Sequence, residues 1–192
     1  MSILKNNNSN PQELTDIELC QRILDREQQL FEVILQRYER MIFGYCMKIL
    51  NNNIQDCEDV VSETFFKIYK NIASYNPNHK FSSWAYRIAH NTAVNLIKKK
   101  SGLFFVDMST FWDLAMPSKE ESIFDIKDLE RVLDKLKFED KNILVLFYIQ
   151  EKTLAEIADI LNITSNTVAQ KLSRSRKKAK RIITQLYDPK KY

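Results

Sequence analysis

The chemistry most clearly indicated by this chain is the binding of a polyanion through lysine and arginine side chains. Residues 165–187 contain no Asp or Glu and seven basic residues: Lys171, Arg174, Arg176, Lys177, Lys178, Lys180 and Arg181. Such a cluster supplies the attraction with which proteins hold nucleic-acid phosphates. The formal net charge of the whole chain is only +4, so the positive charge is segregated rather than spread over the molecule.

The residues before the basic cluster predict a short helix, a tight turn and a second helix. Thr153 and Glu156 have the spacing of a capping box, which marks a helix start. One apolar face follows, formed by Leu154, Ile157, Ala158 and Leu161. Asn162 comes next, and asparagine tolerates the left-handed conformation that ends many helices. Ser165 is then expected to cap the second helix.

The second helix has two sides of different character. Its packing side is predicted to consist of Val168, Leu172, Ser175, Ala179 and Ile182. Its opposite side carries Ala169, Gln170, Ser173, Arg174 and Lys177. This layout is typical of a helix-turn-helix, whose second helix enters the major groove of DNA. The competing interpretation is a helical hairpin with a solvated basic side, but the caps, the turn and the charge together favour DNA binding.

A second stretch without acidic residues covers residues 81–106. One side of a helix in this stretch would present Arg87, Asn91, Asn95 and Lys98, with Trp84 at its edge. The loop before it contributes Tyr75, His79, Lys80 and Phe81. Asparagine can pair with base edges, cations with phosphate, and aromatic rings with unstacked bases. The alternative is that Trp84 and Tyr86 are core residues and that Lys98 to Lys100 only complement a helix dipole.

Residues 54–66 have the opposite character. They contain no Lys or Arg and four acidic residues: Asp56, Glu58, Asp59 and Glu63. Acidic residues at a helix N-terminus are ordinary complements of the helix dipole. Because an acidic surface repels DNA, any partner of this surface is expected to be a protein.

The elements that must position these residues are predicted to be helices. The chain has 192 residues but only two glycines and four prolines, and so few helix breakers favour an all-α fold. Apolar stripes at helical spacing predict helices around residues 15–26, 34–49, 61–72 and 85–96, and again from residue 123. We therefore expect two small helical domains joined by a linker, the second domain containing the helix-turn-helix.

The expected boundaries follow from where the periodicity stops. Residues 1–14 are expected to be a flexible N-terminal tail, 15–100 the first domain, 101–122 the linker and 123–192 the second domain. The linker contains five large apolar residues, Leu103, Phe104, Phe105, Phe111 and Trp112. A purely flexible tether does not need such residues, so they are expected to dock on this chain or on a partner.

Composition argues against several other classes of protein. The N-terminal residues lack the apolar core of a signal peptide, and no apolar run is long enough to insert into a membrane. Cys20, Cys46 and Cys57 fit no metal-ligand spacing, so a reduced cytoplasm is the expected location and no metal or other cofactor is expected. His79 and His90 stand apart from any catalytic set. The chain is therefore predicted not to be an enzyme.

The order of these segments resembles the extracytoplasmic-function sigma factors, which are two-domain initiation subunits of bacterial RNA polymerase. The run DCEDVVSETFFKIYKNIASYNPNHKFSSWAYRIAHNTAVNLIKKK, residues 56–100, is similar to the family's promoter-melting and minus-ten domain, region 2. The run LDKLKFEDKNILVLFYIQEKTLAEIADILNITSNTVAQKLSRSRKKAKRII, residues 133–183, is similar to its minus-thirty-five domain, region 4. The resemblance leaves out mainly the N-terminal tail and the linker.

The resemblance implies roles by position. The surface for core RNA polymerase would consist of Asp56, Asp59, Glu63, Thr64 and Lys67. Capture of a flipped minus-ten base would fall to the loop 76–81, with Asn78, His79, Lys80 and Phe81. The rest of the minus-ten and melting surface would consist of Trp84, Arg87, Asn91, Asn95 and Lys98. Minus-thirty-five bases would face Ala169, Gln170, Ser173 and Arg174, and its phosphates would face Thr167, Lys171, Arg176 and Lys177.

Two departures from the family pattern affect these expectations. The family often has a proline after the Leu-x-x-Leu of the second domain, where this chain has Lys137 and Phe138. It also often has a basic residue where Ala169 stands, and alanine offers only a methyl contact, for example to thymine.

The resemblance also implies binding partners, and two other functions of the chain are alternatives to it. It implies core RNA polymerase and promoter DNA as partners, and an anti-sigma factor is common in the family. The first rival is a stand-alone helix-turn-helix transcription regulator with a helical sensor domain. The second is a protein-interaction module whose basic helix is only solvated.

Overall fold

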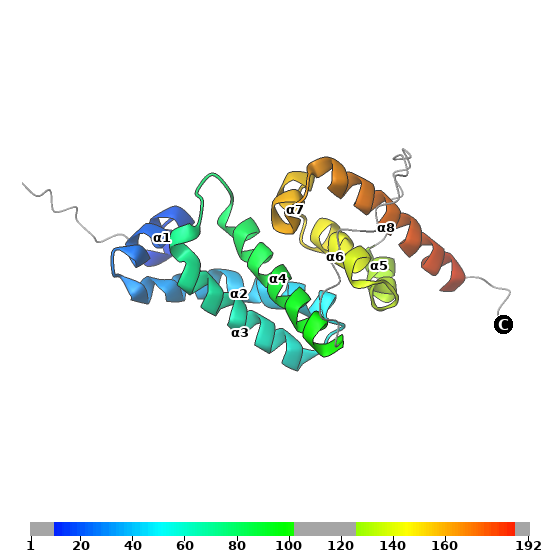
Figure 1. Cartoon of the computed structure of the whole chain (residues 1–192), viewed down its shortest axis with the longest axis horizontal. Helices are drawn as coiled ribbons and strands as arrows, with labels where there is room; N and C mark the ends of the chain where they lie inside the picture. The colour runs from blue at the N-terminus through cyan, green and yellow to red at the C-terminus, as the bar shows by residue number, and fades with distance from the viewer. Residues whose placement is uncertain (1–9, 102–125, 187–192) are drawn as a thin grey trace, which may run out of the picture.

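The computed structural model describes residues 10–101 and 126–186. Within these ranges it contains eight α-helices and no β-strand, which confirms the predicted all-α fold. Figure 1 shows two helical units side by side, with α1 to α4 in the first and α5 to α8 in the second. Most of the expected linker lies outside the described residues, and so do Leu103, Phe104, Phe105, Phe111 and Trp112.

The first unit consists of α1 (Asp16–Leu24), α2 (Phe31–Ile49), α3 (Ile54–Asn71) and α4 (Phe81–Ser101). Thr15 starts α1 with a capping box to Glu18. Asn53 starts α3, because its side-chain oxygen accepts a hydrogen bond of 3.0 Å from the backbone N–H of Asp56. The turn between α2 and α3 has left-handed backbone at Asn51 and Asn52, with φ of 56° and 57°, and asparagine tolerates this conformation well.

The folded part of the chain begins earlier than the sequence predicts. Residues 10–14 were expected in the flexible tail, but Pro11–Glu13 form a 3-10 turn and Leu14 is buried. The Arg37 guanidinium explains the difference: it donates hydrogen bonds to the carbonyl oxygens of Gln12 (3.3 Å) and Leu14 (3.0 Å). A cation on α2 thereby fixes a segment whose own composition is polar.

The three cysteines pack in the core of the first unit. Cys46 and Cys57 are fully buried and Cys20 is almost so, so all three pack as small apolar residues. Burial raises the pKa of the Cys46 thiol to about 12, so it stays protonated and chemically inert at neutral pH.

The second unit consists of α5 (Ile126–Val132), α6 (Phe138–Leu144), a π-helical turn (Val145–Ile149), α7 (Leu154–Leu161) and α8 (Ser165–Leu186). The predicted apolar face before α6 is buried at Leu129, Leu133 and Leu136. Lys137 separates this face from α6 with φ −63° and ψ 154°. A proline would impose the same φ, so the chain breaks at the family's position without needing the proline.

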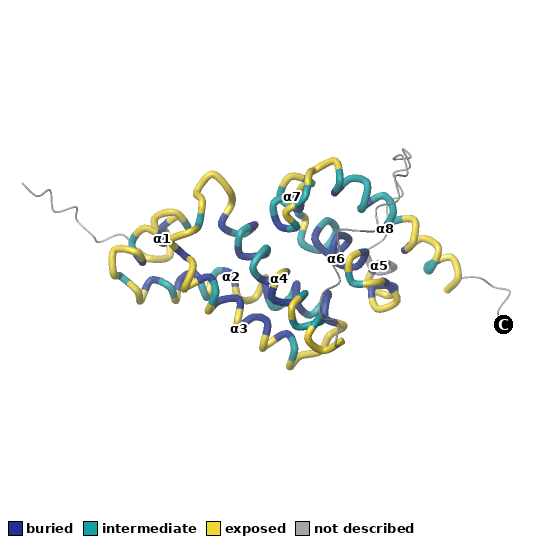
Figure 2. The backbone as a smooth tube through the Cα atoms, viewed as in Figure 1, coloured by how far each residue is buried: buried dark blue, intermediate teal, exposed yellow. Residues whose placement is uncertain are grey.

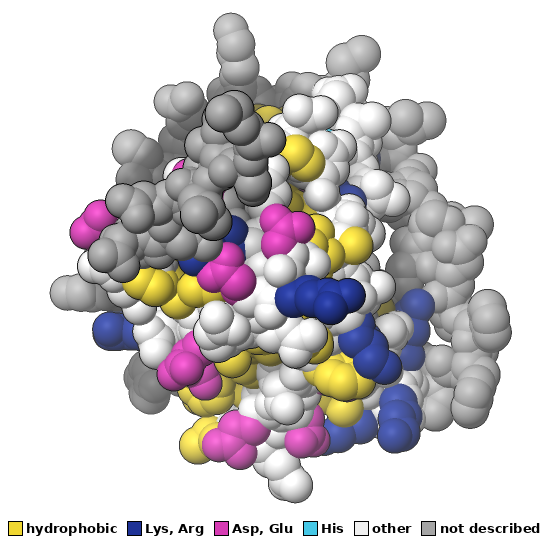
Figure 3. All heavy atoms as spheres, turned by 90° about the vertical axis from the view of Figure 1, so that its left-hand side faces the viewer, with side chains coloured by type: hydrophobic (Ala, Val, Ile, Leu, Met, Phe, Trp, Pro, Cys, Tyr) yellow, Lys and Arg dark blue, Asp and Glu magenta, His cyan; other side chains and the backbone are white. Residues whose placement is uncertain are grey.

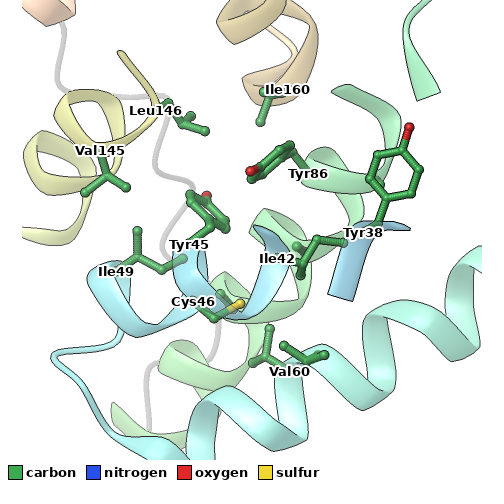
Figure 4. Packing of buried hydrophobic residues seen from close by; sticks show 14 of the residues in the cluster. Tyr38, Ile42, Tyr45, Cys46, Ile49, Val60, Tyr86, Val145, Leu146 and Ile160 are labelled. Atoms are coloured by element: carbon green, nitrogen blue, oxygen red, sulfur yellow. The ribbon is translucent and has the colours of Figure 1, made fainter. Parts of the chain in front are cut away.

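The two units share one continuous apolar core. Figure 4 shows Tyr45 and Tyr86 of the first unit facing Leu146 and Ile160 of the second, and each of the four is at most 1% exposed. The two tyrosine rings pack edge to face with centroids 5.2 Å apart. The sequence patterns do not predict this direct contact, because each apolar residue could equally fill the core of its own unit.

Polar contacts cross the same boundary. The Tyr45 hydroxyl donates to Asn142 Oδ1 at 2.6 Å, and the Tyr86 hydroxyl donates to Gln150 Oε1 at 2.5 Å. At the far end of α2, Lys48 pairs with Glu130 at 2.6 Å. Lys141 is buried and donates to Asn51, and burial lowers the pKa of its amine. The boundary therefore combines apolar packing with hydrogen bonds and ion pairs between the two units.

Candidate nucleic-acid and polymerase interfaces

The helix-turn-helix has the capping box and the left-handed turn that the sequence predicts for it. Thr153 Oγ1 accepts from the N–H of Glu156 at 3.2 Å, and Glu156 Oε2 accepts from the N–H of Thr153 at 2.9 Å, which confirms the predicted capping box. Asn162 ends α7 with φ 53°, as predicted. The predicted cap of α8 is wrong by one residue, because Thr164 accepts from the N–H of Thr167 at 3.2 Å while Ser165 is already helical.

The basic helix α8 packs by the predicted side. Val168, Leu172, Ser175 and Ala179 are buried and Ile182 is half-buried. Its middle is anchored by Asp140 at the start of α6, which accepts from Ser175 Oγ at 2.7 Å and pairs with Lys178 at 2.6 Å. The sequence signal for Asp140 was only that of an acid at a helix start, so its role as an anchor of α8 was missed.

The side of α8 predicted to face minus-thirty-five bases is accessible in part. Its members Ala169, Gln170, Ser173 and Arg174 are half-buried, and Lys177 is exposed. Figure 2 shows the exposed C-terminal turns of α8 extending beyond the packed part of the second unit. Ala169 and Ser173 are the small side chains on this side of the helix.

The three side chains predicted to hold phosphate with Lys177 differ in their surroundings. Thr167 shares a hydrogen bond of 2.8 Å with Thr164 at the helix start. Arg176 stacks over the rings of Phe147 and Tyr148, with its guanidinium carbon 5.1 Å and 5.4 Å from their centroids. Lys171 is half-buried, and burial lowers the pKa of its amine.

The loop between α3 and α4 is held by its own polar groups. The Tyr75 hydroxyl donates to the carbonyl oxygen of His79 at 2.8 Å, and the N–H of Asn78 donates to Asn76 Oδ1 at 3.0 Å. Asn78, His79 and Lys80 are exposed, as Figure 2 shows for this loop. The loop thus presents polar side chains on a backbone that is already ordered.

A cluster of aromatic side chains packs beside the loop. Tyr75, Phe81 and Trp84 have ring centroids 5.2 to 5.5 Å apart. Phe81 is only 1% exposed, so it supports the loop and has no ring face free for a base. Tyr86 is a core residue, as the alternative interpretation of this segment held, whereas Trp84 is half-buried.

A cavity of about 200 Å³ lies against this cluster. Its walls include Asn76, His79, Trp84 and Arg87 of the first unit and Asp159 of the second. Within the described residues, the buried Ser83 hydroxyl at this cavity has no hydrogen-bond partner. No sequence pattern marks Ser83, because a serine in the first turn of a helix has no distinguishing spacing.

The structure divides the predicted minus-ten surface of α4 into two halves. Arg87 is half-buried and its Nε donates to the backbone oxygen of Asp159 on α7 at 2.6 Å. Asn91 and Asn95, further along α4, are exposed, and Lys98 is half-buried. The second unit therefore covers the first half of this surface and leaves the second half open.

The residues predicted to form the polymerase surface on α3 differ in their exposure and in their bonding partners. Asp59 and Glu63 are exposed, whereas Asp56 is paired with Lys100 at 2.5 Å. Thr64 is fully buried and donates to the backbone oxygen of Val60 at 2.6 Å, so its hydroxyl faces the core. Lys67 pairs with Glu63 at 3.2 Å and donates to Thr92 at 3.2 Å.

The sequence reasoning missed an apolar member of this surface. Phe66 lies on the same side of α3 as Asp59 and Glu63 and is 52% exposed, with the Lys70 amine 4.5 Å from its ring centroid. Figure 3 shows acidic and apolar side chains interleaved over the end of the first unit. A phenylalanine on the polar side of an amphipathic helix could have been found from periodicity alone.

The described ranges can also be checked for metal sites and for membrane-spanning helices. No three His, Cys, Asp or Glu side chains within them come close enough together to hold a metal ion. None of the helices in the same ranges is both long and apolar enough to cross a bilayer.

Sequence comparison places these surfaces in two family regions. Residues 34–102 match the model of Sigma-70 region 2, and residues 126–178 match that of Sigma-70, region 4. The ECF RNA polymerase sigma factor SigW of Bacillus subtilis is 34% identical over 163 residues, covering 78% of this chain and 87% of SigW. The ECF RNA polymerase sigma-E factor of Haemophilus influenzae is 24% identical over 178 residues, covering 86% of this chain and 93% of that protein.

Solved structures show the same fold. The sigma factor RpoE of Bartonella quintana, in complex with the anti-sigma factor NepR, superposes with a TM-score of 0.60 at 16% identity, covering 80% of this chain and 96% of that one. CnrH in complex with the cytosolic domain of CnrY gives 0.62 at 17% identity, covering 87% and 96%. A match in both regions disfavours a stand-alone regulator, which would need only the helix-turn-helix. The chain belongs to the extracytoplasmic-function subfamily of RNA polymerase sigma factors.

Proposed function

We propose that three surfaces of this sigma factor divide the work of initiation. The exposed acidic and apolar side of α3 binds core polymerase, the α3–α4 loop with α4 binds and melts the minus-ten element, and α8 reads the minus-thirty-five element. The chain acts in the cytoplasm and catalyses no covalent step itself. The observation that supports this division most is that acidic and basic surfaces are segregated onto different helices of one chain.

The polymerase surface is proposed to centre on Asp59, Glu63 and Phe66. All three side chains are exposed on one side of α3, and an exposed aromatic among charges is typical of a protein-binding patch. Asp56 and Lys67 are partly engaged within the chain, so they contribute at the edge of the patch. Thr64 supports α3 from the core and makes no direct contact.

The minus-ten surface is proposed to combine the cavity beside Trp84 with the open half of α4. A base flipped out of the duplex needs a pocket with aromatic walls and polar groups for its edge, and the unpartnered Ser83 hydroxyl is one such group. Asn91 and Asn95 offer amide groups to neighbouring bases, and Lys98 to Lys100 attract the phosphates.

The minus-thirty-five surface is proposed to be read by the first turns of α8. Arg174 reads a base edge, for which guanine is the best partner of arginine, and Ala169 and Ser173 allow close approach. Lys177 is exposed and binds phosphate. Arg176 and Lys171 contribute to the electrostatic potential around the helix more than to direct contacts, because the Arg176 guanidinium stacks over Phe147 and Tyr148 and burial lowers the pKa of the Lys171 amine.

The proposed mechanism depends on contacting the minus-ten and minus-thirty-five elements together, because each contact is weak by itself. Once core polymerase holds the chain, contact with one promoter element raises the effective concentration of the other element at its own surface. Capture of a base in the loop cavity then offsets part of the unstacking cost, which is on the order of a few kcal/mol. The solved RpoE structure is a complex with the anti-sigma factor NepR, and we propose that a protein partner of this kind regulates the present chain.

The polymerase surface can be tested by charge reversal. The double variant Asp59→Lys/Glu63→Lys should lose binding to core polymerase by at least about tenfold, because a basic patch cannot replace an acidic one. Glu39→Lys, an exposed acid on α2, is the matched control and should bind like the wild type. Equal binding by the double variant and the control would show that polymerase binds elsewhere.

A further inference from the structure

A second hollow lies in the groove between α3 and α4, beside the open half of the proposed minus-ten surface. Its volume is about 290 Å³. Four residues of α3 and four of α4 line it: Asp59, Val60, Glu63, Lys67, Thr92, Asn95, Leu96 and Lys99. Residues of the proposed polymerase surface and of the proposed minus-ten surface therefore meet in one hollow.

The Lys67 amine joins the two walls of this hollow. Its Nζ pairs with Glu63 Oε1 at 3.2 Å on its own helix and donates to Thr92 Oγ1 at 3.2 Å on α4. An ammonium group has three N–H donors, so these two partners among the described residues leave one donor for a ligand. The Lys67 side chain is 36% exposed, and this donor is therefore within reach of a molecule that enters the hollow.

The α4 wall offers groups of a complementary kind. Asn95 is exposed, and its amide carries both hydrogen-bond donors and an acceptor. Lys99, about one turn further along α4, is exposed as well and attracts phosphate. Val60 and Leu96 add apolar surface to the walls. Apolar walls with a few polar groups for the edge of the base are what an enzyme uses to hold an unstacked base.

The open side of α4 leads a DNA strand past this hollow. At about 100° per residue, one sector of the helix about 60° wide contains Trp84, Asn91, Asn95 and Lys98. Trp84 lies at the first cavity and Asn95 at the second, and the helix between them rises by about 16 Å. A stacked strand covers this distance in about five nucleotides at about 3.4 Å each. One strand can therefore reach both hollows.

The polar groups of the second hollow favour one class of base. Lys67 can donate to a carbonyl oxygen, but it cannot accept a hydrogen bond from an amine. Thymine and guanine have a keto oxygen beside a ring N–H, so Lys67 can donate to the oxygen while the Asn95 amide oxygen accepts from the N–H. Adenine and cytosine have an amino group in place of this oxygen, and it would face Lys67 as donor against donor.

We propose that the hollow between α3 and α4 is a second base pocket, which takes a keto base of the displaced strand once the minus-ten element has melted. Lys67 and Asn95 read the base, and Lys99 holds its phosphate. This inference deepens the proposed function and rests on it, because α4 must hold the displaced strand. It gives Lys67 a role in base selection besides its place at the edge of the polymerase surface.

The test is a binding competition on DNA that is already open. Holoenzyme, formed with the full-length chain, binds duplexes whose minus-ten element is held open by a mismatched template strand. The displaced-strand nucleotides of this element are randomised one position at a time. Only the ratio between bases at a position is read, so a variant that binds core polymerase less tightly still reports its base preference.

The wild type should favour thymine and guanine over adenine and cytosine at one position by about fivefold, the size expected for one hydrogen bond. Lys67→Met keeps the aliphatic part of the side chain and removes the donor, so it should lose this preference and keep those at other positions. Asn95→Ala should lose it too. Arg40→Met removes an exposed cation of α2 and is the matched control, which should select bases like the wild type.

The position of the preference is a further check. Ser83→Ala should change selection at the base that enters the first cavity, because Ser83 lies at that cavity. The keto preference should fall within about five nucleotides of this base, and Ser83→Ala should leave it unchanged. A keto preference that depends on Ser83 and not on Lys67 would assign it to the first cavity and overturn the second pocket.

The remaining outcomes separate this inference from the proposed function. No keto preference in the wild type, or a preference that survives in Lys67→Met, overturns the second pocket while binding of the open element persists. A loss in Asn95→Ala alone overturns it as well, because α4 would then read the base without α3. If wild-type holoenzyme binds the open element no better than a fully paired one, it is the proposed melting function that fails, and the second pocket fails with it.

Discussion

The Tyr45 hydroxyl donates a hydrogen bond of 2.6 Å to Asn142 Oδ1, although 97 residues separate the two in the chain. Both side chains are buried, and burial raises the pKa of the Tyr45 hydroxyl well above its ordinary value, so it remains a donor at neutral pH. This bond joins α2 of region 2 to α6 of region 4. It is a fully buried polar link between the two regions.

Tyr45→Phe should weaken the association of the two regions. Removing the donor leaves Asn142 Oδ1 without this hydrogen bond in a buried place, which costs about 1–3 kcal/mol. Limited proteolysis of the segment between the regions should then become faster. Tyr38→Phe is the matched control, because Tyr38 donates to Asp16 within region 2 at 2.5 Å. If both variants are digested at the same rate, the Tyr45 bond does not hold the regions together.

His90 should make the packing of the two regions against each other sensitive to acid. It lies stacked on Phe138 with ring centroids 5.9 Å apart, and its Nδ1 is 3.2 Å from Asn142 Nδ2. Burial lowers the pKa of His90 to about 4 from an ordinary 6.5, and the charge of Lys171 acts in the same direction.

The direction of the effect follows from proton uptake. When the two regions separate, His90 takes up a proton below pH 6.5, whereas in the packed structure it does not until about pH 4. The packed arrangement of the two regions should therefore lose stability as pH falls through this window, by up to about 3 kcal/mol at about 1.4 kcal/mol per pH unit. Small-angle scattering between pH 7 and pH 5 should show expansion for the wild type. His90→Gln should remove most of this pH dependence; an equal expansion in both would assign it to another group.

Asp140→Asn should damage region 4 alone. Asp140 is 8% exposed and joins α6 to α8 through Ser175 and Lys178. Loss of its charge weakens two charge-assisted hydrogen bonds, at about 1.5–3 kcal/mol for such a bond. Hydrogen exchange should increase in α8 and stay unchanged in α3. Glu139→Gln, the exposed neighbour, is the control, and comparable exchange in the two variants would contradict the role given to Asp140.

Arg174→Ala should change the sequence preference of DNA binding, whereas Lys177→Ala should change its overall strength. Loss of a base-reading arginine should relax preference at one position of the minus-thirty-five element, by about 1–3 kcal/mol. Loss of a phosphate-binding lysine should weaken binding evenly across sequences and reduce its salt dependence. Selection from a randomised minus-thirty-five library, with holoenzyme, measures both. A uniform loss with Arg174→Ala would place that side chain on the backbone of DNA instead.

Local signals made the helix-turn-helix predictable. The capping box at Thr153, the left-handed Asn162 and the buried side of α8 each depend on residues within a few positions of one another. The start of α8 was misplaced by one residue because Thr164 and Ser165 are both good caps, and only the backbone geometry distinguishes them.

The burial of single side chains was harder to predict where the prediction depended only on a match to a functional position of the family. Thr64 and Phe81 match functional positions, yet both are buried. Phe66 matches none and is exposed. Position along a motif does not determine burial, because burial also depends on the elements that pack against the helix.

The contact between the regions could not be predicted from the sequence. Arg87 and Asp159 are 72 positions apart, and no pattern in the chain relates them. Leu146 and Ile160 have the hydrophobicity of ordinary core residues, so nothing marks them as part of a boundary between regions.

Bound to core polymerase, this chain is proposed to melt promoter DNA through α4. The most direct measurement is permanganate reactivity of thymines in the minus-ten element of a promoter selected with the holoenzyme. Wild-type holoenzyme should make these thymines reactive, and Asn91→Ala should reduce that reactivity at least about fivefold while protection of the minus-thirty-five element is unchanged. Unreactive thymines with the wild type, or full reactivity with Asn91→Ala, would contradict this account of the minus-ten surface.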